Sequence, residues 1–439
     1  MRDIFLVVLI GAGLLATFRF PFVGVLMWTW FTCMDPHQEA FGFAKTLQFN
    51  EAIAAVTILS WLVSKERKTL PFGVPVAALI LFLIWMTVNG FFAVDPDWSW
   101  PLWDRVWRII ALGLLIIPMA TTKIRMHSLV WMVVLSLFYY GIKGGLFTIV
   151  TGGGGHVLGP LDSIIGDNNH LAVALLMVVP LANYLRLHSA NRYISYGLLA
   201  GMALSVVAVV GTYSRGGLVT LAGLAAFAWL RTRGRLVYPI VAAIIIVPAL
   251  WIMPQSYDDR LSTIKHADTD ESFAGRMQAW QVAWDYATDH FPFGDGFAGA
   301  ERPQVFNRYL PNADTHAAHS IYFEVLGDQG FMGLAIYLAI IVSAFANCAQ
   351  TKKLTRGRSE FVWAYDLANM MQLSLFAFCL GGSALSLAYY DVFFILVSLS
   401  VTLRAFVLLQ IPETQRSFRR STQPRSKFAR TDKQLAAGR

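Results

Sequence analysis

The sequence predicts an all-α polytopic membrane protein of about twelve transmembrane helices (thirteen possible) with one large periplasmic helical loop. Hydrophobic residues make up 56% of the 439 residues, and charged residues only 14%. Apolar segments follow one another along most of the chain, and a helix needs about 20 residues to cross a bilayer. Because lipid cannot satisfy exposed backbone groups, these segments are expected to be helical. A soluble protein of this length would carry more charge.

The predicted spans cover residues 4–34, 46–63, 74–94, 105–121, 127–150, 168–186, 194–212, 214–230, 236–253, 320–347, 362–382 and 385–409. The first span contains Arg19 and Pro21, so it is either one broken helix or a short hairpin. A hairpin would give thirteen spans and an amino terminus outside. No small-residue cleavage site follows the short basic start, so we expect an uncleaved first segment.

These spans divide the chain into four parts. Residues 1–253 form the first nine or ten spans, residues 254–319 the large polar loop, residues 320–410 the last spans, and residues 411–439 a basic tail. Lys and Arg gather in alternate connections, at 65–68, 123–125, 186–192, 231–235 and 352–358, and in the tail. The connections at 95–104 and 151–167 contain Asp but neither Lys nor Arg.

Short basic connections are retained in the cytoplasm. We therefore expect a multi-pass membrane protein whose acidic connections and large loop face the side opposite the cytoplasm. The net charge of +8 then follows from topology. The tail is expected to contact membrane lipids rather than nucleic acid, and no Gly-rich phosphate loop is present.

Other short motifs favour structural roles. Asp95 and Asp97 flank a proline before a helix, which is typical of a turn and an N-cap, although such a pair can also hold a metal. The run 152–155 of glycines indicates a loop, because no helix follows it directly. The three cysteines, Cys33, Cys348 and Cys379, are too widely spaced for a metal site or a disulfide framework.

Inside the large loop, apolar residues recur at spacings of four and three and predict an amphipathic helix that packs on the bundle or lies at the membrane surface. They are Phe273, Met277, Trp280, Trp284 and Ala287. Arg276 lies beside this stripe, so its guanidinium can enter a cleft, although a solvated surface arginine is also compatible with the pattern. The segment 292–297, PFGDGF, predicts a turn that closes the helix.

Arg215, in GTYSRGG, lies at the expected outer end of two apolar helices, where an arginine contradicts the charge bias of the other short connections. Such an arginine either pairs with a carboxylate or binds an anion. Gly216 and Gly217 leave room for a bulky group to approach closely.

His316 and His319 lie where the loop becomes the span that begins IYFEVLGDQG. If Asp314 or Thr315 caps that helix, both histidines fall in its first turns, where the helix dipole disfavours the imidazolium. A neutral histidine can act as a general base near neutral pH. A structural role and a zinc site are the alternatives, and no third metal ligand has suitable spacing.

Four segments resemble, in order, the signatures of the bacterial O-antigen ligase superfamily, whose members are ligases and polymerases with a GT-C-like fold. They are DNNHLAVALLMVVPL, TYSRGG, GRMQAWQVAWDYATDHFPFGDGF and HSIYFEVLGDQGFMGL, within residues 160–345. Residues 19–43 resemble a subgroup of O-glycosylation ligases associated with exosortase-type gene clusters.

The resemblance implies transfer of a glycan from an undecaprenyl-diphosphate carrier to lipid A–core at the periplasmic face of the bacterial inner membrane, without a metal, nucleotide or other cofactor. It matches Arg215 and Arg276 to the family's arginines and His319 to its histidine. The arginines would neutralise the departing diphosphate, and His319 would accept the proton of the acceptor hydroxyl.

The resemblance also assigns substrate-binding roles to His316, Tyr322, Asn168 and Asn169. Many relatives carry His-x-His followed by Asn, whereas this chain has two intervening residues between its histidines and then a serine. Which histidine is the base therefore stays open.

Three other functions compete with the ligase. A polymerase of the same superfamily, or a ligase that glycosylates a pilin or another protein, would use the same chemistry. A transporter would carry charges at mid-bilayer and a repeat that relates its two halves, and the sequence contains neither.

Overall fold

The computed structural model describes residues 2–66, 68–231, 271–311 and 313–411, and within these ranges the chain is helical, without strands. The predicted span 236–253, most of the connection 231–235, residues 254–270 of the loop and the tail from 412 lie outside the described residues.

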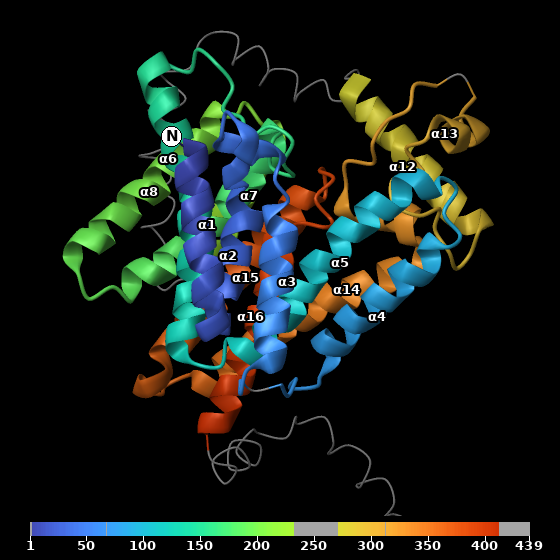
Figure 1. Ribbon diagram of the computed structural model, residues 1–439. Coiled ribbons are helices and arrows are strands. Elements are labelled where there is room, and N and C mark those ends of the chain that lie inside the picture. The colour runs from blue at the N-terminus through green and yellow to red at the C-terminus, as the bar shows by residue number, and fades with distance from the viewer. Residues whose placement is uncertain (1, 67, 232–270, 312, 412–439) are drawn as a thin grey trace, which may run out of the picture.

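The α-helices are α1 (Arg2–Arg19), α2 (Pro21–Met34), α3 (Phe49–Val63), α4 (Val74–Gly90), α5 (Pro96–Met119), α6 (Lys123–Thr151), α7 (Asn168–Leu187), α8 (Arg192–Gly211), α9 (Arg215–Arg231), α12 (Glu271–Asp289), α13 (Pro303–Tyr309), α14 (Ile321–Thr355), α15 (Val362–Gly382) and α16 (Asp391–Gln410). Short 3₁₀ turns η1 (Pro36–Glu39), η2 (Phe43–Thr46) and η4 (Ser359–Phe361) join some of them. Figure 1 shows one bundle, from which α12 and α13 project at one side.

The first predicted span forms a hairpin of two helices. Proline starts α2 directly after α1 ends, because its ring cannot continue the preceding helix. The two helices then run antiparallel, with Gly13 against Met27 and Gly24 against Thr17. At 14 residues α2 is about 21 Å long, which is shorter than a bilayer core.

Among the described residues, five helices are long and apolar enough to cross a membrane: α6, α7, α8, α14 and α16. Three shorter apolar helices, α2, α3 and α4, accompany them. The all-helical fold is thus as predicted, whereas the number of twelve or thirteen spans stays a prediction.

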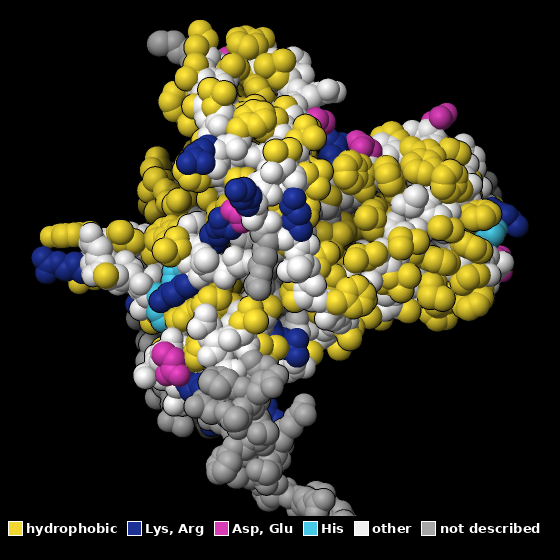
Figure 2. Space-filling model, turned by 60° about the horizontal axis from the view of Figure 1, so that its bottom comes forward, with side chains coloured by type: hydrophobic (Ala, Val, Ile, Leu, Met, Phe, Trp, Pro, Cys, Tyr) yellow, Lys and Arg dark blue, Asp and Glu magenta, His cyan; other side chains and the backbone are white. Residues whose placement is uncertain are grey.

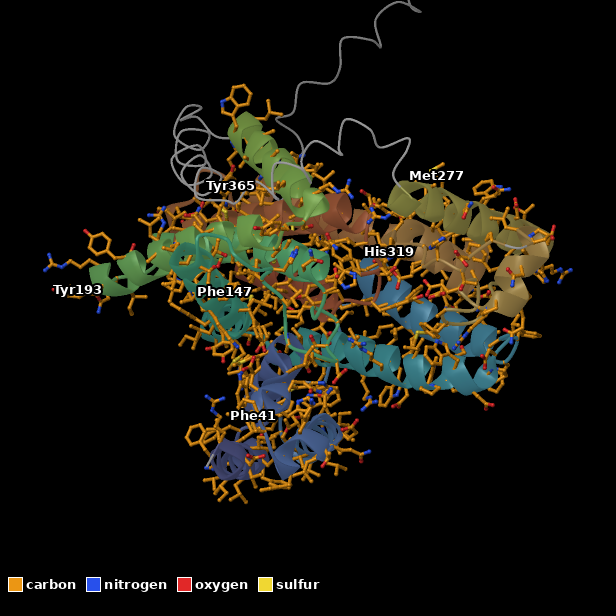
Figure 3. The ribbon with its side chains drawn as sticks, turned by 90° about the horizontal axis from the view of Figure 1, so that it is seen from above. Phe41, Phe147, Tyr193, Met277, His319 and Tyr365 are labelled. Atoms are coloured by element: carbon orange, nitrogen blue, oxygen red, sulfur yellow. The ribbon has the colours of Figure 1, made fainter. Side chains whose placement is uncertain are left out.

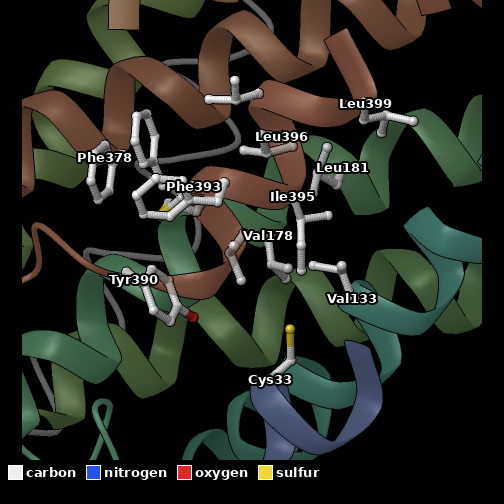
Figure 4. Packing of buried hydrophobic residues seen from close by; sticks show 14 of the residues in the cluster. Cys33, Val133, Val178, Leu181, Phe378, Tyr390, Phe393, Ile395, Leu396 and Leu399 are labelled. Carbon is white, nitrogen blue, oxygen red and sulfur yellow. The ribbon is translucent and has the colours of Figure 1, made fainter. Parts of the chain in front are cut away.

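The core forms around α7 and α16, which are buried along most of their length. In Figure 4 aromatic and aliphatic side chains from several helices meet there, and Phe378 of α15 stacks on Phe393 of α16 with ring centroids 4.5 Å apart. Because neighbouring helices surround α16, its hydrophobic residues are not confined to one face, as is typical of a helix in the centre of a bundle.

Several predicted span limits differ from the helix limits, and two of the differences are explained by the residues at the start of the helix. The helix predicted over 105–121 begins at Pro96, since Asp95 caps it and proline is favoured in a first turn. The span predicted over 385–409 begins only at Asp391, because residues 383–390 form a connection that reaches the loop. Their apolar composition had suggested membrane, yet they line the protein interior.

The segment PFGDGF anchors the loop to a break in α14. The helix is interrupted at Gly330, whose φ is 67°. There the backbone N–H groups of Asp295 and Gly296 donate to the carbonyls of Gly327 and Asp328, both at 3.1 Å. Broken helices leave carbonyls without helical partners, so the loop replaces the missing hydrogen bonds.

Basic connections meet at one end of the bundle. Arg125 pairs with Glu66 at 2.5 Å, and Lys123 lies over the ring of Trp363, so three of these connections come together. Figure 2, which brings the lower end forward, shows Lys and Arg side chains gathered there. The loop helices α12 and α13 lie at the upper end in Figure 1. Which side of the membrane each end faces stays a prediction.

Candidate active site

The start of α7 is fixed to the turn between α8 and α9. Asp167 caps α7, because its Oδ1 accepts from the backbone N–H of Asn169 at 2.8 Å. The Asn168 amide donates to the carbonyl of Thr212 at 2.8 Å, and the Ser214 hydroxyl donates to the Asn169 side-chain oxygen at 2.7 Å. Both asparagines predicted to bind substrate therefore hold the neighbouring turn, and a substrate role for them stays a prediction.

That turn places Arg215 at the first position of α9. Tyr213 adopts a left-handed backbone with φ 59°, and the Ser214 hydroxyl accepts from the N–H of Gly217 at 2.9 Å, which caps the helix. A Cβ on Gly217 would lie 2.7 Å from Ala172, whereas one on Gly216 would meet nothing closer than 3.9 Å. Only Gly216 thus leaves open space, since Gly217 serves the packing of α9 on α7.

The loop helix α12 packs on α14 and carries Arg276. Trp280 donates its indole N–H to the carbonyl of Ala318 at 2.6 Å and stacks on Phe323 with centroids 4.9 Å apart. The predicted helix is therefore confirmed, but its predicted apolar stripe is only partly buried, because Met277 and Trp284 are exposed.

Ala279, Val282, Ala283 and Tyr286 form the buried face of α12 instead. Within the predicted stripe, Ala287 is also buried and Trp280 packs on Phe323, so the buried face coincides with the stripe only in part. Beyond α12, the turn that closes the helix lies at 290–292, just before most of PFGDGF rather than within 292–297.

His316 packs against the backbone of α12. A Cβ on Gly275 would lie 2.9 Å from the His316 ring, so glycine is what permits the contact. Phe306 approaches the same ring edge-on. These contacts favour a packing role for His316 next to Arg276.

His319 occupies the centre of the candidate site. In Figure 3 it lies beside α12, which carries Met277. Its backbone is left-handed, with φ 42°, and its N–H donates to the hydroxyl of Ser386 at 3.1 Å. A left-handed conformation is strained for a residue with a Cβ, and such strain gathers at functional sites.

The environment of His319 keeps its ring neutral. Burial lowers its pKa most, the charge of Arg276 lowers it further, and His170 and His316 add to the effect, while Asp167 opposes them. Its buried Nδ1 has no hydrogen-bond partner among the described residues. Charges on α7 and α12 therefore act on one half-buried imidazole, which is able to accept a proton near neutral pH.

The predicted cap of this helix is wrong. The helix α14 begins at Ile321 after Ser320, and residues 313–319 are not helical, so neither histidine lies in a first turn. The pKa of His319 is lowered mainly by burial and by a neighbouring arginine. Tyr322 lies in the first turn, but its hydroxyl donates to the Cys379 carbonyl of α15 at 3.3 Å, and its substrate role stays a prediction.

Buried carboxylates beneath the site escaped the sequence reasoning. Asp295 is 1% exposed and Asp328 is 5% exposed. Burial raises the pKa of Asp295, and the Asp328 charge raises it further. Glu301 accepts from the N–H of Ala318 at 3.3 Å, one residue before the central histidine. The acidic residues inside two glycine-rich motifs, GDG and GDQG, were the signal that could have revealed them.

Asp95 has a structural role. It caps α5 by accepting from the N–H of Trp98 at 3.3 Å and pairs with Arg302 at 3.5 Å. Within the described ranges, no group of three or more His, Cys, Asp or Glu side chains is arranged to hold a metal. Cys33 and Cys348 are buried, Cys379 is partly buried, and all three are free thiols.

Residues 200–338 match a family model described as O-Antigen ligase. Residues 1–191 match a second model, described as a family of unknown function. No curated protein matches the chain. Arg215, Arg276 and His319 lie in the first matched region, and Asn168 and Asn169 lie in the second. Residues from both regions thus meet in the candidate site, and the resemblance to the exosortase-associated subgroup stays a prediction.

Proposed function

The chain belongs to the O-antigen ligase superfamily through residues 200–338, and from this premise we propose that it is an O-antigen ligase. It transfers a glycan from an undecaprenyl-diphosphate carrier to lipid A–core. The reaction takes place at the periplasmic face of the bacterial inner membrane.

The observation that carries this proposal is the meeting of Arg276 with His319. The arginine comes from the loop helix and the histidine from the entry to α14, and the positive charge of the first lowers the pKa of the second. Arg215 is the first residue of α9 and follows Ser214. Ser214 is hydrogen bonded to Asn169 at the start of α7, and Asp167 and His170 at the same helix start affect the pKa of His319. A guanidinium beside a neutral base suits the departure of a diphosphate and the attack of a hydroxyl, and we assign Arg215 to the same diphosphate.

In the proposed reaction His319 accepts the proton of the acceptor hydroxyl. The hydroxyl oxygen bonds to the anomeric carbon as the bond from that carbon to the diphosphate oxygen breaks. Arg215 and Arg276 neutralise the charge that develops on the leaving diphosphate, for which arginine's planar fork is well suited. One displacement from the opposite face of the sugar inverts the anomeric configuration.

Membrane topology supports the proposed location. The basic connections meet at the end of the bundle that lies away from the loop helices. Under the positive-inside rule that end is cytoplasmic, so the site opens on the opposite side.

Mass analysis of the products tests the proposal. The purified protein, given undecaprenyl-diphosphate glycan and lipid A–core, should add one glycan to each acceptor and release undecaprenyl diphosphate. Lengthened carrier-linked glycan would instead identify a polymerase, and glycan on a pilin or another protein would identify a protein ligase. Either result would overturn the proposed acceptor.

A further inference from the structure

A polar cavity of about 400 Å³ lies outside the candidate active site. Residues of α2, α3, α5, the loop 151–167 and the first residue of α16 line it. Apart from α16, these segments belong to the region that matches a family of unknown function. Small-molecule sites have volumes of about 300–1,000 Å³, so the cavity is large enough for a ligand.

Three residues that line this cavity each carry a buried side-chain atom that has no hydrogen-bond partner among the described residues. These atoms are the indole Nε1 of Trp28, the Nδ1 of His37 and the side-chain oxygen of Asn50. Buried polar groups are nearly always hydrogen bonded, so three such atoms around one cavity indicate a polar occupant.

Arg105 supplies a charge with no fixed partner in the described part of the chain. It lines the cavity and forms neither a hydrogen bond nor an ion pair with a described residue. The neighbouring Arg108, in contrast, pairs with Glu51 and Asp104. The carboxylates of Asp35, Asp391 and Glu324 lie within electrostatic range of Arg105.

The balance of charge argues against a phosphate as the occupant. Two arginines, Arg105 and Arg108, face four carboxylates in the lining, those of Asp35, Glu51, Asp162 and Asp391. Burial raises the pKa of Asp35 to about 7, and the charge of Asp391 raises it further. A carboxylate-rich wall repels a phosphate but accepts hydrogen bonds from hydroxyl groups, and the indole N–H donates to them.

The cavity is also linked to the active site. Asp162, which lines the cavity, and Asp35 both have left-handed backbones, with φ 59° and 48°. Two residues after Asp162, the carbonyl of Ile164 accepts from Nδ1 of His170 at 2.9 Å. The same loop then reaches the cap of α7, so the cavity and the site share one connecting segment.

We propose that this cavity is a saccharide-binding site that holds sugar rings through Trp28, Asn50 and Arg105 while transfer takes place at His319. The sugar is either part of the donor glycan away from the diphosphate or part of the acceptor core. The identity of the ligand rests on the proposed function, whereas the cavity and its unsatisfied polar atoms are independent of it.

Direct binding measurements test this proposal without turnover. Purified full-length protein is titrated with three probes: the oligosaccharide released from the carrier, the lipid-free core oligosaccharide, and inorganic pyrophosphate. We expect one saccharide to bind and pyrophosphate not to compete with it. Whichever saccharide binds identifies the source of the ligand as donor or acceptor.

Two variants locate the binding. Trp28→Phe removes one N–H and should weaken saccharide binding about three- to tenfold, and Arg105→Gln, at an exposed side chain, should weaken it by more than about tenfold. Trp229→Phe, a matched substitution at an exposed tryptophan of α9, should bind like the wild type.

Arg215→Ala separates this site from the proposed chemistry, because it should lose transfer and keep saccharide binding. Unchanged affinity in both Trp28→Phe and Arg105→Gln would overturn the proposal. So would the failure of folded wild-type protein to bind either saccharide. If Arg215→Ala kept transfer, the mechanism would fail while the saccharide site would stand.

Discussion

Asn89 on α4 holds the loop that positions Arg276, and its replacement by alanine should loosen both the fold and the site. Its amide donates to the carbonyl of Asp328 at 2.6 Å, and its side-chain oxygen accepts from the N–H of Gly294 at 2.9 Å. Asn89 is fully buried. One side chain therefore joins α4, the break in α14 and the segment PFGDGF.

The cost of Asn89→Ala can be worked out from these two bonds. The N–H of Gly294 would lose the bond to Asn89 and stay buried, which costs about 1–3 kcal/mol. The carbonyl of Asp328 would keep the bond from Gly296 and lose one of two, about 0.5–1.5 kcal/mol. Together these losses amount to about 1.5–4.5 kcal/mol before any cavity is counted.

The melting temperature of the purified protein in detergent measures this effect, with glycan transfer as the second readout. Asn307→Ala, at an exposed position of α13, is the matched control. Its free energy of unfolding should lie within about 0.5 kcal/mol of the wild-type value, so its melting temperature should be close to that of the wild type. Asn89→Ala should melt lower and lose transfer at temperatures where it is still folded, because Arg276 and His319 are less well held. A wild-type melting temperature for Asn89→Ala would refute the reasoning.

Three further predictions concern the site and its orientation. His319→Ala should reduce transfer on the order of 10²–10⁴-fold. Burial and the charge of Arg276 lower the pKa of His319, so in the wild type this histidine becomes protonated, and the rate should fall, only below pH 6.5. Arg276→Gln removes a positive charge, so the acid limb of its residual rate should move to higher pH; an unmoved limb would contradict the assignment. Arg215→Lys should lose about as much activity as Arg215→Ala, on the order of 10²–10³-fold, because a point charge cannot reproduce a bidentate fork; wild-type turnover by Arg215→Lys would rule this out. A thiol reagent that cannot cross the inner membrane should label Asn307→Cys but not Ser359→Cys in intact cells, and the opposite pattern would invert the topology.

The limits of a helix were predictable where they depend only on the length of a continuous apolar segment. The helix α15 has the predicted limits, and α7 differs from its prediction by one residue, because both are continuous apolar segments between polar ends. Prediction was wrong at residues 385–390, whose apolar composition suggested membrane. There Ser386 and Ala388 bond to residues of the α14 entry, and no local pattern reveals such a contact.

The candidate residues followed from chemistry, but their roles depended on packing. Sequence identified Arg215 by its unusual place and Arg276 by its position beside an apolar stripe. It could not separate His316 from His319, since both stand before the same helix. Contact with Gly275 distinguishes the first, and a strained backbone in an electropositive, half-buried place distinguishes the second.

By itself, the sequence determined a helical membrane protein with its polar chemistry at one end of the bundle. Hydrophobic length and the spacing of Lys and Arg are local properties, and a bilayer acts on them segment by segment. Only the tertiary structure decided which polar groups meet, since Asp167, Arg276 and His319 come from three segments far apart in the chain. Their effect on one another requires burial and short distances, which exist only once α12 packs on α14 and PFGDGF fills the break at Gly330.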